Sequence, residues 1–364
     1  MKLKNVTIKE FEKKVQDKNI VCYGAGELFK DMFLTMNESF LSRITCVIDT
    51  YKKLEEIKIG KFNIKCESEE RLEKLNPQKE LILICSNYCY EIYNKLENKL
   101  SNINIECYVY VIMSLTVSDS SRFNIKADVS KKSIPKIIHY CWFGGNDMPY
   151  SNKRCLDSWK ELCPDYEIIR WDESNYDWTK NKYMYQAYMN KKWGFVPDYA
   201  RLDIIYNYGG IYLDTDVELI KRPDDLLNYN GYMGFQRNFW INLGLGFGAV
   251  KNNLLVGKMK EIYDELEFID KDGNMNMKAS PYYQTTTLKT LGIQCNNITQ
   301  IYDNNLILST DYLDPQGYKN GDLYITDNTI SIHHYDESWV NDKTKNDKIY
   351  CQINKIRNYI EKYN

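Results

Sequence analysis

The feature that most constrains the fold is an alternation of short apolar runs with helical segments over the first 112 residues. The apolar runs are short enough for buried strands and lie at 19–23, 44–49, 81–86 and 105–113. Helix patterns separate them, at 27–40, 68–75 and 90–100. Strands that alternate with helices predict a parallel sheet with helices on its faces. We therefore expect a small Rossmann-like α/β domain over residues 1–112.

A glycine turn follows the first main strand. Gly24 and Gly26 open the next helix, and Asp49 ends the next strand, where a dinucleotide-binding fold places its phosphate loop and ribose-binding acid. The third glycine of that fingerprint is replaced by Phe29. Two interpretations stay open, a nucleotide site and a turn that needs glycine only for its shape. The missing glycine favours the turn, and we expect no bound NAD or FAD.

A second α/β pattern covers residues 134–340, after a segment without periodicity at 113–133 that we interpret as a linker. The chain then ends in a predicted helix over 341–364, whose apolar stripe consists of Ile349, Ile353, Ile356 and Ile360. This stripe, flanked by lysines, predicts either a peripheral contact with an anionic membrane or packing on the domain before it.

Composition narrows the function classes. Lys plus Arg number 48 and Asp plus Glu number 50, so the chain lacks the basic surplus of a nucleic-acid-binding protein. No apolar run approaches the roughly 18 residues of a transmembrane helix, and the first residues do not resemble a signal peptide. The 11 cysteines are an odd, scattered set, typical of reduced thiols. We therefore expect a cytoplasmic protein.

The most informative segment runs from Asp198 to Asp216. Asp198 and Arg201 are three residues apart on a predicted helix and so share a face. A glycine pair ends that helix, and a short buried strand leads to Asp214 and Asp216 at its carboxyl end, where α/β sheets bind ligands. Two such carboxylates can hold one Mn²⁺ or Mg²⁺ ion, although a solvated acidic turn has the same pattern.

This arrangement, D-x-x-R-L followed by G-G-I-Y-x-D-x-D, resembles glycosyltransferase family 32, the group with a DxD sugar-binding region. That group includes fungal initiating mannosyltransferases, α-1,4-galactosyltransferases and capsular polysaccharide enzymes, and glucosylating clostridial toxins share its layout. The segments 134–139 and 142–144 are similar to the family's opening strand, and the likeness extends to about residue 339. The resemblance implies a GT-A fold, a nucleotide-sugar donor and a divalent metal.

The resemblance also implies roles for single residues. Asp198 and Arg201 are expected to hold the donor sugar, beside the metal ligands Asp214 and Asp216. A late strand is expected to supply a third ligand. Successive strand residues face opposite ways, so only one of His333 and His334 can face the cleft. We favour His333, and Glu337 is a rival. The remaining candidates for binding the nucleotide-sugar are His139, Tyr140, Trp142, Ser338 and Trp339, with core packing as the alternative for the two aromatic residues of the opening strand.

We expect a retaining glycosyltransferase that moves a hexose from a UDP- or GDP-sugar to a glycan or a lipid-linked oligosaccharide, in capsule or other surface polysaccharide synthesis. Retention is favoured because no motif supplies a covalent nucleophile or a base on the far side of the sugar. Asn242 with the glycine-rich stretch after it, and the segment 279–286, are expected to line the donor sugar. Two alternatives stay open: a toxin-like enzyme that modifies a protein side chain, and a non-catalytic sugar-nucleotide-binding protein.

Overall fold

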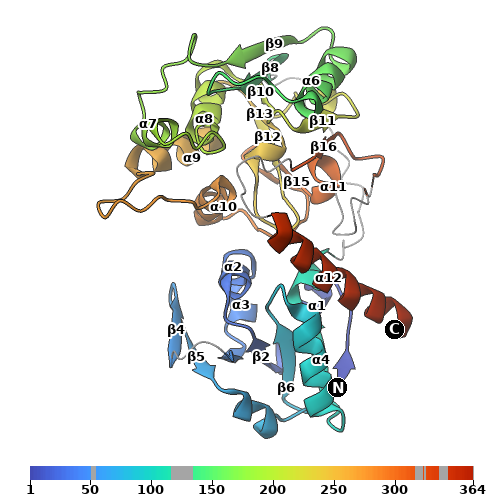
Figure 1. Cartoon of the computed structure of the whole chain (residues 1–364). Helices are drawn as coiled ribbons and strands as arrows, with labels where there is room; N and C mark the ends of the chain where they lie inside the picture. The colour runs from blue at the N-terminus through green and yellow to red at the C-terminus, as the bar shows by residue number, and fades with distance from the viewer. Residues whose placement is uncertain (51–54, 116–133, 316–322, 324, 336–342, 364) are drawn as a thin grey trace. The chain divides into compact units, whose positions relative to one another are not determined.

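The computed structural model describes residues 1–50, 55–115, 134–315, 323, 325–335 and 343–363. These residues form two compact units, coloured by position in the chain in Figure 1. The first unit contains the elements from β1 to α5 together with the C-terminal helix α12, and the second contains those from β8 to β16.

The first unit is built on a sheet whose described strands lie in the order β1 (Lys2–Leu3), β7 (Glu106–Val109), β6 (Glu80–Ile84), β2 (Asn19–Tyr23), β3 (Ile44–Ile48), β5 (Phe62–Glu67) and β4 (Glu56–Ile59). Every pair is parallel except the β4–β5 hairpin, so the α/β class with a parallel sheet predicted for these residues is confirmed. The helices of this unit are α1 (Ile8–Lys14), α2 (Glu27–Thr35), α3 (Glu38–Leu41), α4 (Cys89–Leu100) and α5 (Tyr110–Leu115). The short segments 15–17 and 69–74 are 3₁₀ helices.

One predicted strand is too long. The run 105–113 is a strand only as far as Val109, and α5 begins at the next residue. Its apolar residues are buried in both elements, and a continuous apolar run carries no periodicity that separates a buried strand from a buried helix. The β4–β5 hairpin and the two-residue strand β1 were not predicted.

The glycine turn of the first unit is held by a hydrogen bond to another residue of the same unit. The backbone N–H of Ala25 donates to Oδ2 of Asp49 over 2.8 Å, so the expected ribose-binding acid closes the turn. Phe29 is fully buried and packs edge-on against Phe33. Both observations favour the turn interpretation over a dinucleotide site.

The C-terminal helix α12 (Lys343–Tyr363) packs on the first unit. Ile353, Ile356 and Ile360 are buried in the same apolar cluster as α4. Gln352 donates to Oε1 of Glu91 over 2.5 Å and accepts the backbone N–H of that residue over 3.1 Å. The expected packing on the second domain is therefore wrong, and the buried stripe removes the reason to predict that it enters a membrane. No helix among the described residues has the length and apolar character needed to span a membrane.

The second unit is built on a sheet with the described strand order β14 (Gln300–Tyr302), β15 (Asn305–Leu308), β12 (Gly231–Gly234), β13 (Phe247–Ala249), β10 (Gly210–Tyr212), β8 (Ile137–Cys141) and β9 (Glu167–Trp171). Strands β10, β8 and β9 are parallel, and β13 runs antiparallel to both of its neighbours. A second, two-stranded sheet pairs β11 (Val217–Leu219) with β16 (Ser331–His333). The predicted α/β class is confirmed.

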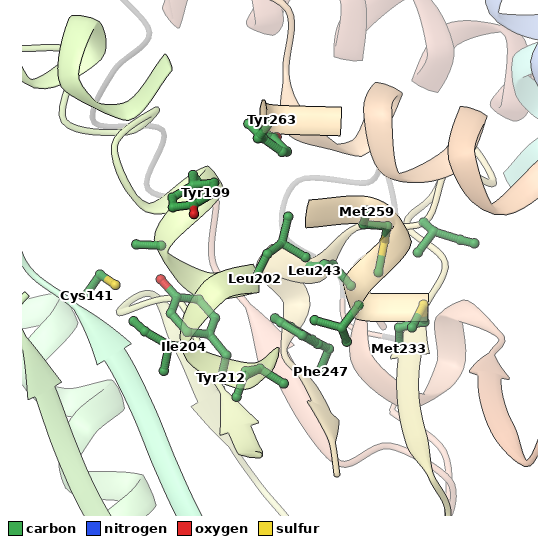
Figure 2. Packing of buried hydrophobic residues seen from close by; sticks show 14 of the residues in the cluster. Cys141, Tyr199, Leu202, Ile204, Tyr212, Met233, Leu243, Phe247, Met259 and Tyr263 are labelled. Carbon is green, nitrogen blue, oxygen red and sulfur yellow. The ribbon is translucent and has the colours of Figure 1, made fainter. Parts of the chain in front are cut away.

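Helices cover both faces of this sheet (Figure 1). One face carries α7 (Lys182–Met189), α8 (Pro197–Tyr208), α9 (Leu254–Glu265) and α10 (Ser280–Thr290), and the other carries α6 (Tyr150–Leu162) and α11 (Thr310–Leu313). The pleat of β10 divides its side chains between the two cores, because Tyr212 points to the α8 side and its two neighbours to the α6 side. Figure 2 shows Tyr212 and Phe247 packed with Leu202 of α8 in the first of these cores.

Candidate active site

Helix α8, strand β10 and the glycine pair between them carry most of the polar residues of the site. Pro197 occupies the first turn of α8, where a missing N–H costs nothing, and Gly209 ends the helix with φ +71°. A Cβ on Gly210 would lie 2.8 Å from the carbonyl oxygen of Ile137, so β10 can approach β8 only with glycine there. The glycine pair therefore turns the chain directly from the helix into strand β10, which ends two residues before Asp214.

Arg201 links the helix to the DxD segment. Its Nη2 lies 3.1 Å from Oδ1 of Asp198, one helical turn earlier, and 3.5 Å from Oδ1 of Asp214. Asp198 and Arg201 are 3% and 4% exposed, so this is a buried pair and not the surface ion pair that the same spacing can form. The predicted sharing of one helix face is confirmed.

A late strand brings a histidine to the two aspartates. Strand β16 pairs antiparallel with β11, which follows Asp216 directly, and Val217 lies opposite His333. Nε2 of His333 is 3.3 Å from Oδ1 of Asp216. Asp214, Asp216 and His333 each have a ligand atom within 4.8 Å of the others. His334 points elsewhere, with its Nε2 2.8 Å from Oε2 of Glu218.

The wall opposite Asp214 is a 3₁₀ turn at 243–245. A Cβ on Gly244 would lie 2.6 Å from Oδ2 of Asp214 and 2.9 Å from Oδ1 of Asn242, so this residue must lack a side chain. Asn242 fixes the turn by accepting the N–H of Gly244 over 2.7 Å. The glycine-rich stretch predicted to line the donor sugar therefore lies against the DxD carboxylate itself.

Helix α10 supports this wall from behind. Oε1 of Gln284 accepts the backbone N–H of Leu243 over 3.0 Å, and Thr285 accepts that of Ile241 over 2.9 Å. Ser280, the first residue of α10, is one of the groups that favour the charged form of Asp198. The segment 279–286 thus borders the site, in agreement with the expectation from the sequence.

The electrostatics of the site are dominated by buried negative charge. Burial raises the pKa of Asp198 to about 6 and also raises the pKa of Asp214, while Arg201 acts in the opposite direction on both. Burial lowers the pKa of Arg201, but Asp214 and other neighbours outweigh it, so that pKa is raised and the guanidinium stays charged. For His333, burial lowers the pKa, whereas Asp216 and Asp214 raise it, and the net shift is upward.

The opening strand β8 does not supply a ligand-binding histidine. His139 is 1% exposed, its Nδ1 accepts a hydrogen bond from Trp171 over 3.1 Å, and its Nε2 lies 3.0 Å from the carbonyl oxygen of Gly209. Burial lowers the pKa of this imidazole to about 4. Both ring nitrogens are used inside the protein, so the expected role of His139 in nucleotide binding is replaced by support of the glycine pair.

The two aromatic residues of β8 differ in exposure. Tyr140 is 9% exposed and packs edge-on against Trp159 of α6, which corresponds to the core-packing alternative. Trp142 is partly exposed at the carboxyl end of β8, beside the parallel strand that ends at Asp214, and its Nε1 donates to the carbonyl oxygen of Asn146 over 2.7 Å. Trp142 therefore stays the candidate for base stacking. Glu337, Ser338 and Trp339 lie outside the described residues.

Two contributions to the site were missed in the sequence. The stretch around Gly244 was singled out, but the close approach of that residue to Asp214 was not. Asp314, which is buried near His333, lies in no sequence motif. A lone aspartate after a short helix carries no pattern that could have identified it.

Residues 149–232 match the protein family described as "Glycosyltransferase sugar-binding region containing DXD motif". This is the DxD family that the sequence resembles. The matched segment begins just before α6 and contains α8, β10 and both DxD aspartates.

The chain is also similar to fungal enzymes over part of its length. It is 36% identical over 131 residues to inositol phosphoceramide mannosyltransferase 3 of Schizosaccharomyces pombe, which covers 33% of this chain and 34% of that protein. It is 29% identical over 151 residues to a mannosyl phosphorylinositol ceramide synthase of Saccharomyces cerevisiae, covering 37% and 38%. The chain thus spans about a third of the length of these relatives. Among solved structures, a "PaToxG Glycosyltransferase" aligns with a TM-score of 0.36 and 20% identity over 44% of this chain and 70% of that one.

The ligand atoms that meet after β10 fit a divalent cation. Asp214 and Asp216 offer hard oxygen ligands, and His333 offers an imidazole nitrogen that suits Mn²⁺ better than Mg²⁺. Arg201 pairs with Asp198 and Asp214, so the three aspartates of the site carry more negative charge than that guanidinium balances. A cation held by Asp214, Asp216 and His333 would offset that excess.

Proposed function

We propose that the second unit is a metal-dependent glycosyltransferase that uses a nucleotide-sugar donor. The observation that carries this proposal is the convergence of Asp214, Asp216 and His333 beside the buried pair of Asp198 and Arg201. These residues come from three segments of the chain, and four of the five lie in the region that matches the DxD glycosyltransferase family. When bound, the cation supplies charge stabilisation to a departing diphosphate.

The residues of the chain have distinct tasks in this proposal. Asp198 offers carboxylate oxygens to sugar hydroxyls, and burial within the protein keeps water from competing for them. Arg201 is fixed by two carboxylates, so its guanidinium is held in place before the donor arrives. Its positive charge lies where it can stabilise negative charge that develops on the oxygen leaving the sugar.

We further propose that the transfer retains the configuration of the donor sugar. An inverting enzyme needs a carboxylate base on the side of the sugar opposite the leaving group. The carboxylates of the described site are all engaged with Arg201 or His333, on the side where the diphosphate is expected. The leaving phosphate is then the group that accepts the proton of the acceptor hydroxyl.

For the donor and the acceptor, the names of the relatives suggest a first choice. The fungal proteins are named as mannosyltransferases of inositol phosphoceramide. We therefore propose GDP-mannose as the first donor to test and a lipid-linked acceptor as the first acceptor class. A role of this protein in capsule or other surface polysaccharide synthesis stays a prediction. The toxin-like and non-catalytic alternatives also stay open.

One experiment tests the enzyme and names the donor. The purified full chain is incubated with GDP-mannose, UDP-glucose, UDP-galactose or UDP-N-acetylglucosamine, with Mn²⁺ or with EDTA, and released nucleoside diphosphate is measured. We expect release from one donor, with Mn²⁺ only. Asp216→Asn should lower it about 100-fold or more, whereas Asp272→Asn, on an exposed loop, should not change it. Donor binding without any release would instead favour the non-catalytic alternative.

A further inference from the structure

Helix α6 is hydrogen-bonded to the segment that carries the DxD aspartates. Asn152, in the first turn of the helix, donates from Nδ2 to Oγ1 of Thr215 over 3.1 Å. About two helical turns later, Nε1 of Trp159 donates to the carbonyl oxygen of Val217 over 2.7 Å. One side of α6 therefore runs along this segment, and the bond from Asn152 reaches the residue that lies between the two aspartates.

The side chain of Asn152 is buried, at 7% exposure, and it does not cap its own helix. Asparagine near the start of a helix commonly serves as the N-cap. The N-cap of α6 is Pro149, however, and no side chain among the described residues caps this helix end. Oδ1 of Asn152 accepts from the hydroxyl of Ser151 over 3.3 Å, which leaves Nδ2 to Thr215. The amide of Asn152 therefore serves a residue of another element.

The DxD aspartates lie at a turn of the backbone. The N–H of Val217 donates to the carbonyl oxygen of Asp214 over 3.0 Å, and this bond closes a four-residue turn with Thr215 and Asp216 at its centre. The backbone angles of Thr215 therefore set how the carboxylate of Asp214 is oriented relative to that of Asp216. The two carboxylates can share a cation only if this turn keeps them on one side, where their ligand atoms and that of His333 lie within 4.8 Å of one another.

Each residue of this turn is held by a different element. Asp214 contacts Arg201 of α8. The carbonyl oxygen of Asp216 accepts the backbone N–H of the residue that follows β16, over 2.9 Å. Thr215 is held by α6, through the amide of Asn152. This last contact acts on the residue whose conformation relates the two carboxylates to each other.

We propose that Asn152 is a positioning residue for the metal site: its hydrogen bond to Thr215 fixes the turn so that Asp214 and Asp216 direct their carboxylates to one cation. Ligands that are held in place before an ion arrives bind it more tightly, because less conformational freedom is lost on binding. The inference rests on the metal-dependent function proposed above.

Asn152→Ala and Thr215→Val remove this hydrogen bond from its two ends. The Mn²⁺ affinity of the full chain is measured by calorimetry for both variants and for the double variant. We expect each single variant to bind Mn²⁺ about 3- to 10-fold more weakly, in line with the loss of one hydrogen bond. The double variant should bind no more weakly than either single variant, because the second change removes nothing further. An unchanged affinity in either single variant, or losses that multiply in the double variant, would overturn the proposal.

Ser158→Ala is the matched control. Oγ of Ser158 accepts the N–H of Leu219 over 3.0 Å, so this change also removes a hydrogen bond between α6 and the same segment, but at a residue beyond the DxD turn. The control should lose stability in thermal unfolding and keep the Mn²⁺ affinity of the wild-type chain. If it binds Mn²⁺ as weakly as Asn152→Ala, α6 supports the whole segment without a particular role for Asn152, and the proposal is wrong.

Hydrogen exchange at the amide of Val217 reports on the turn without added metal, because this amide donates to Asp214. In full-length protein labelled with ¹⁵N-valine, we expect the amide to exchange about 3- to 10-fold faster in Asn152→Ala than in the wild-type chain. Ser158→Ala should leave this rate unchanged. An unchanged rate in Asn152→Ala would mean that the turn does not depend on Asn152, and would overturn the proposal.

The outcomes separate this inference from the proposed function. A wild-type chain that does not bind Mn²⁺ contradicts the metal site, while the exchange rate at Val217 still decides whether Asn152 holds the turn. A wild-type chain that binds Mn²⁺, but no more tightly than Asn152→Ala does, supports the metal site and overturns the role of Asn152.

Discussion

Replacing Gly244 with alanine tests how closely the protein is packed around Asp214. Gly244 is not among the residues with positive φ, so alanine fits its backbone and adds only a methyl group. That methyl carbon would lie 2.6 Å from Oδ2 of Asp214 and 2.9 Å from Oδ1 of Asn242. Carbon–oxygen contacts are ordinarily no shorter than about 3.3 Å. Either Asp214 or the turn at 243–245 must therefore move by roughly 0.7 Å, and Asn242 by about half as much.

The size of the effect follows from that displacement. Misplacing a catalytic group by about 1 Å can cost a factor of about 100, which corresponds to about 2.7 kcal/mol in activation free energy. We therefore expect Gly244→Ala to lower donor turnover by 10- to 100-fold and to weaken Mn²⁺ binding, because relief of the contact changes the placement of Asp214 relative to the wall that faces it. Overpacking a buried site costs about 1–3 kcal/mol of the free energy of unfolding, so the protein should still fold.

The assay is nucleoside diphosphate release, with Mn²⁺ affinity and thermal unfolding measured on the same samples. Gly257→Ala is the matched control, because its methyl group would meet the Tyr206 ring at 2.9 Å and so overpack the same unit away from the site. That control should lose stability but keep turnover. Full turnover in Gly244→Ala would refute the reasoning, because it would mean that close packing of this turn against Asp214 is not needed for turnover.

Three further predictions concern other parts of the chain. Arg201→Lys should lower turnover at least about 10-fold, because an ammonium group cannot bind Asp198 and Asp214 as a guanidinium does; normal kinetics would contradict this. Because the pKa of His139 is about 4 when folded and higher when unfolded, the unfolded chain binds more protons between pH 6.5 and 4, and stability should fall by about 3 kcal/mol over that range. His139→Gln should flatten this slope in urea titrations. Ile356→Ala should lower the unfolding free energy of the first unit by about 2–5 kcal/mol, and an unchanged transition would show that α12 does not hold that unit together.

Local sequence rules are enough to predict the structure of the segment that carries the DxD aspartates. Pro197, the glycine pair and the apolar run after it specify a helix, a turn and a strand through local rules, so the shared face of Asp198 and Arg201 could be predicted. That only one of His333 and His334 can face the cleft also follows from a local rule, the alternation of side chains along a strand. The parallel sheet of the first unit followed from the order of short apolar runs.

Which distant residues meet this segment depends on the packing of the whole second unit. Strand β16 reaches the DxD aspartates because it pairs with β11, a strand more than 100 residues earlier, and no local pattern encodes that pairing. The same holds for Gly244, whose importance lies in its closeness to side-chain oxygens of Asp214 and Asn242. The place of His139 in an opening strand can be predicted from the sequence, and it suggests a role in nucleotide binding. Its burial against Gly210 cannot be predicted from the sequence. The apolar stripe of α12 illustrates the same limit of sequence-based prediction. Its periodicity predicts that one face of the helix is buried, but it does not predict which domain buries that face, because that depends on how the whole chain packs.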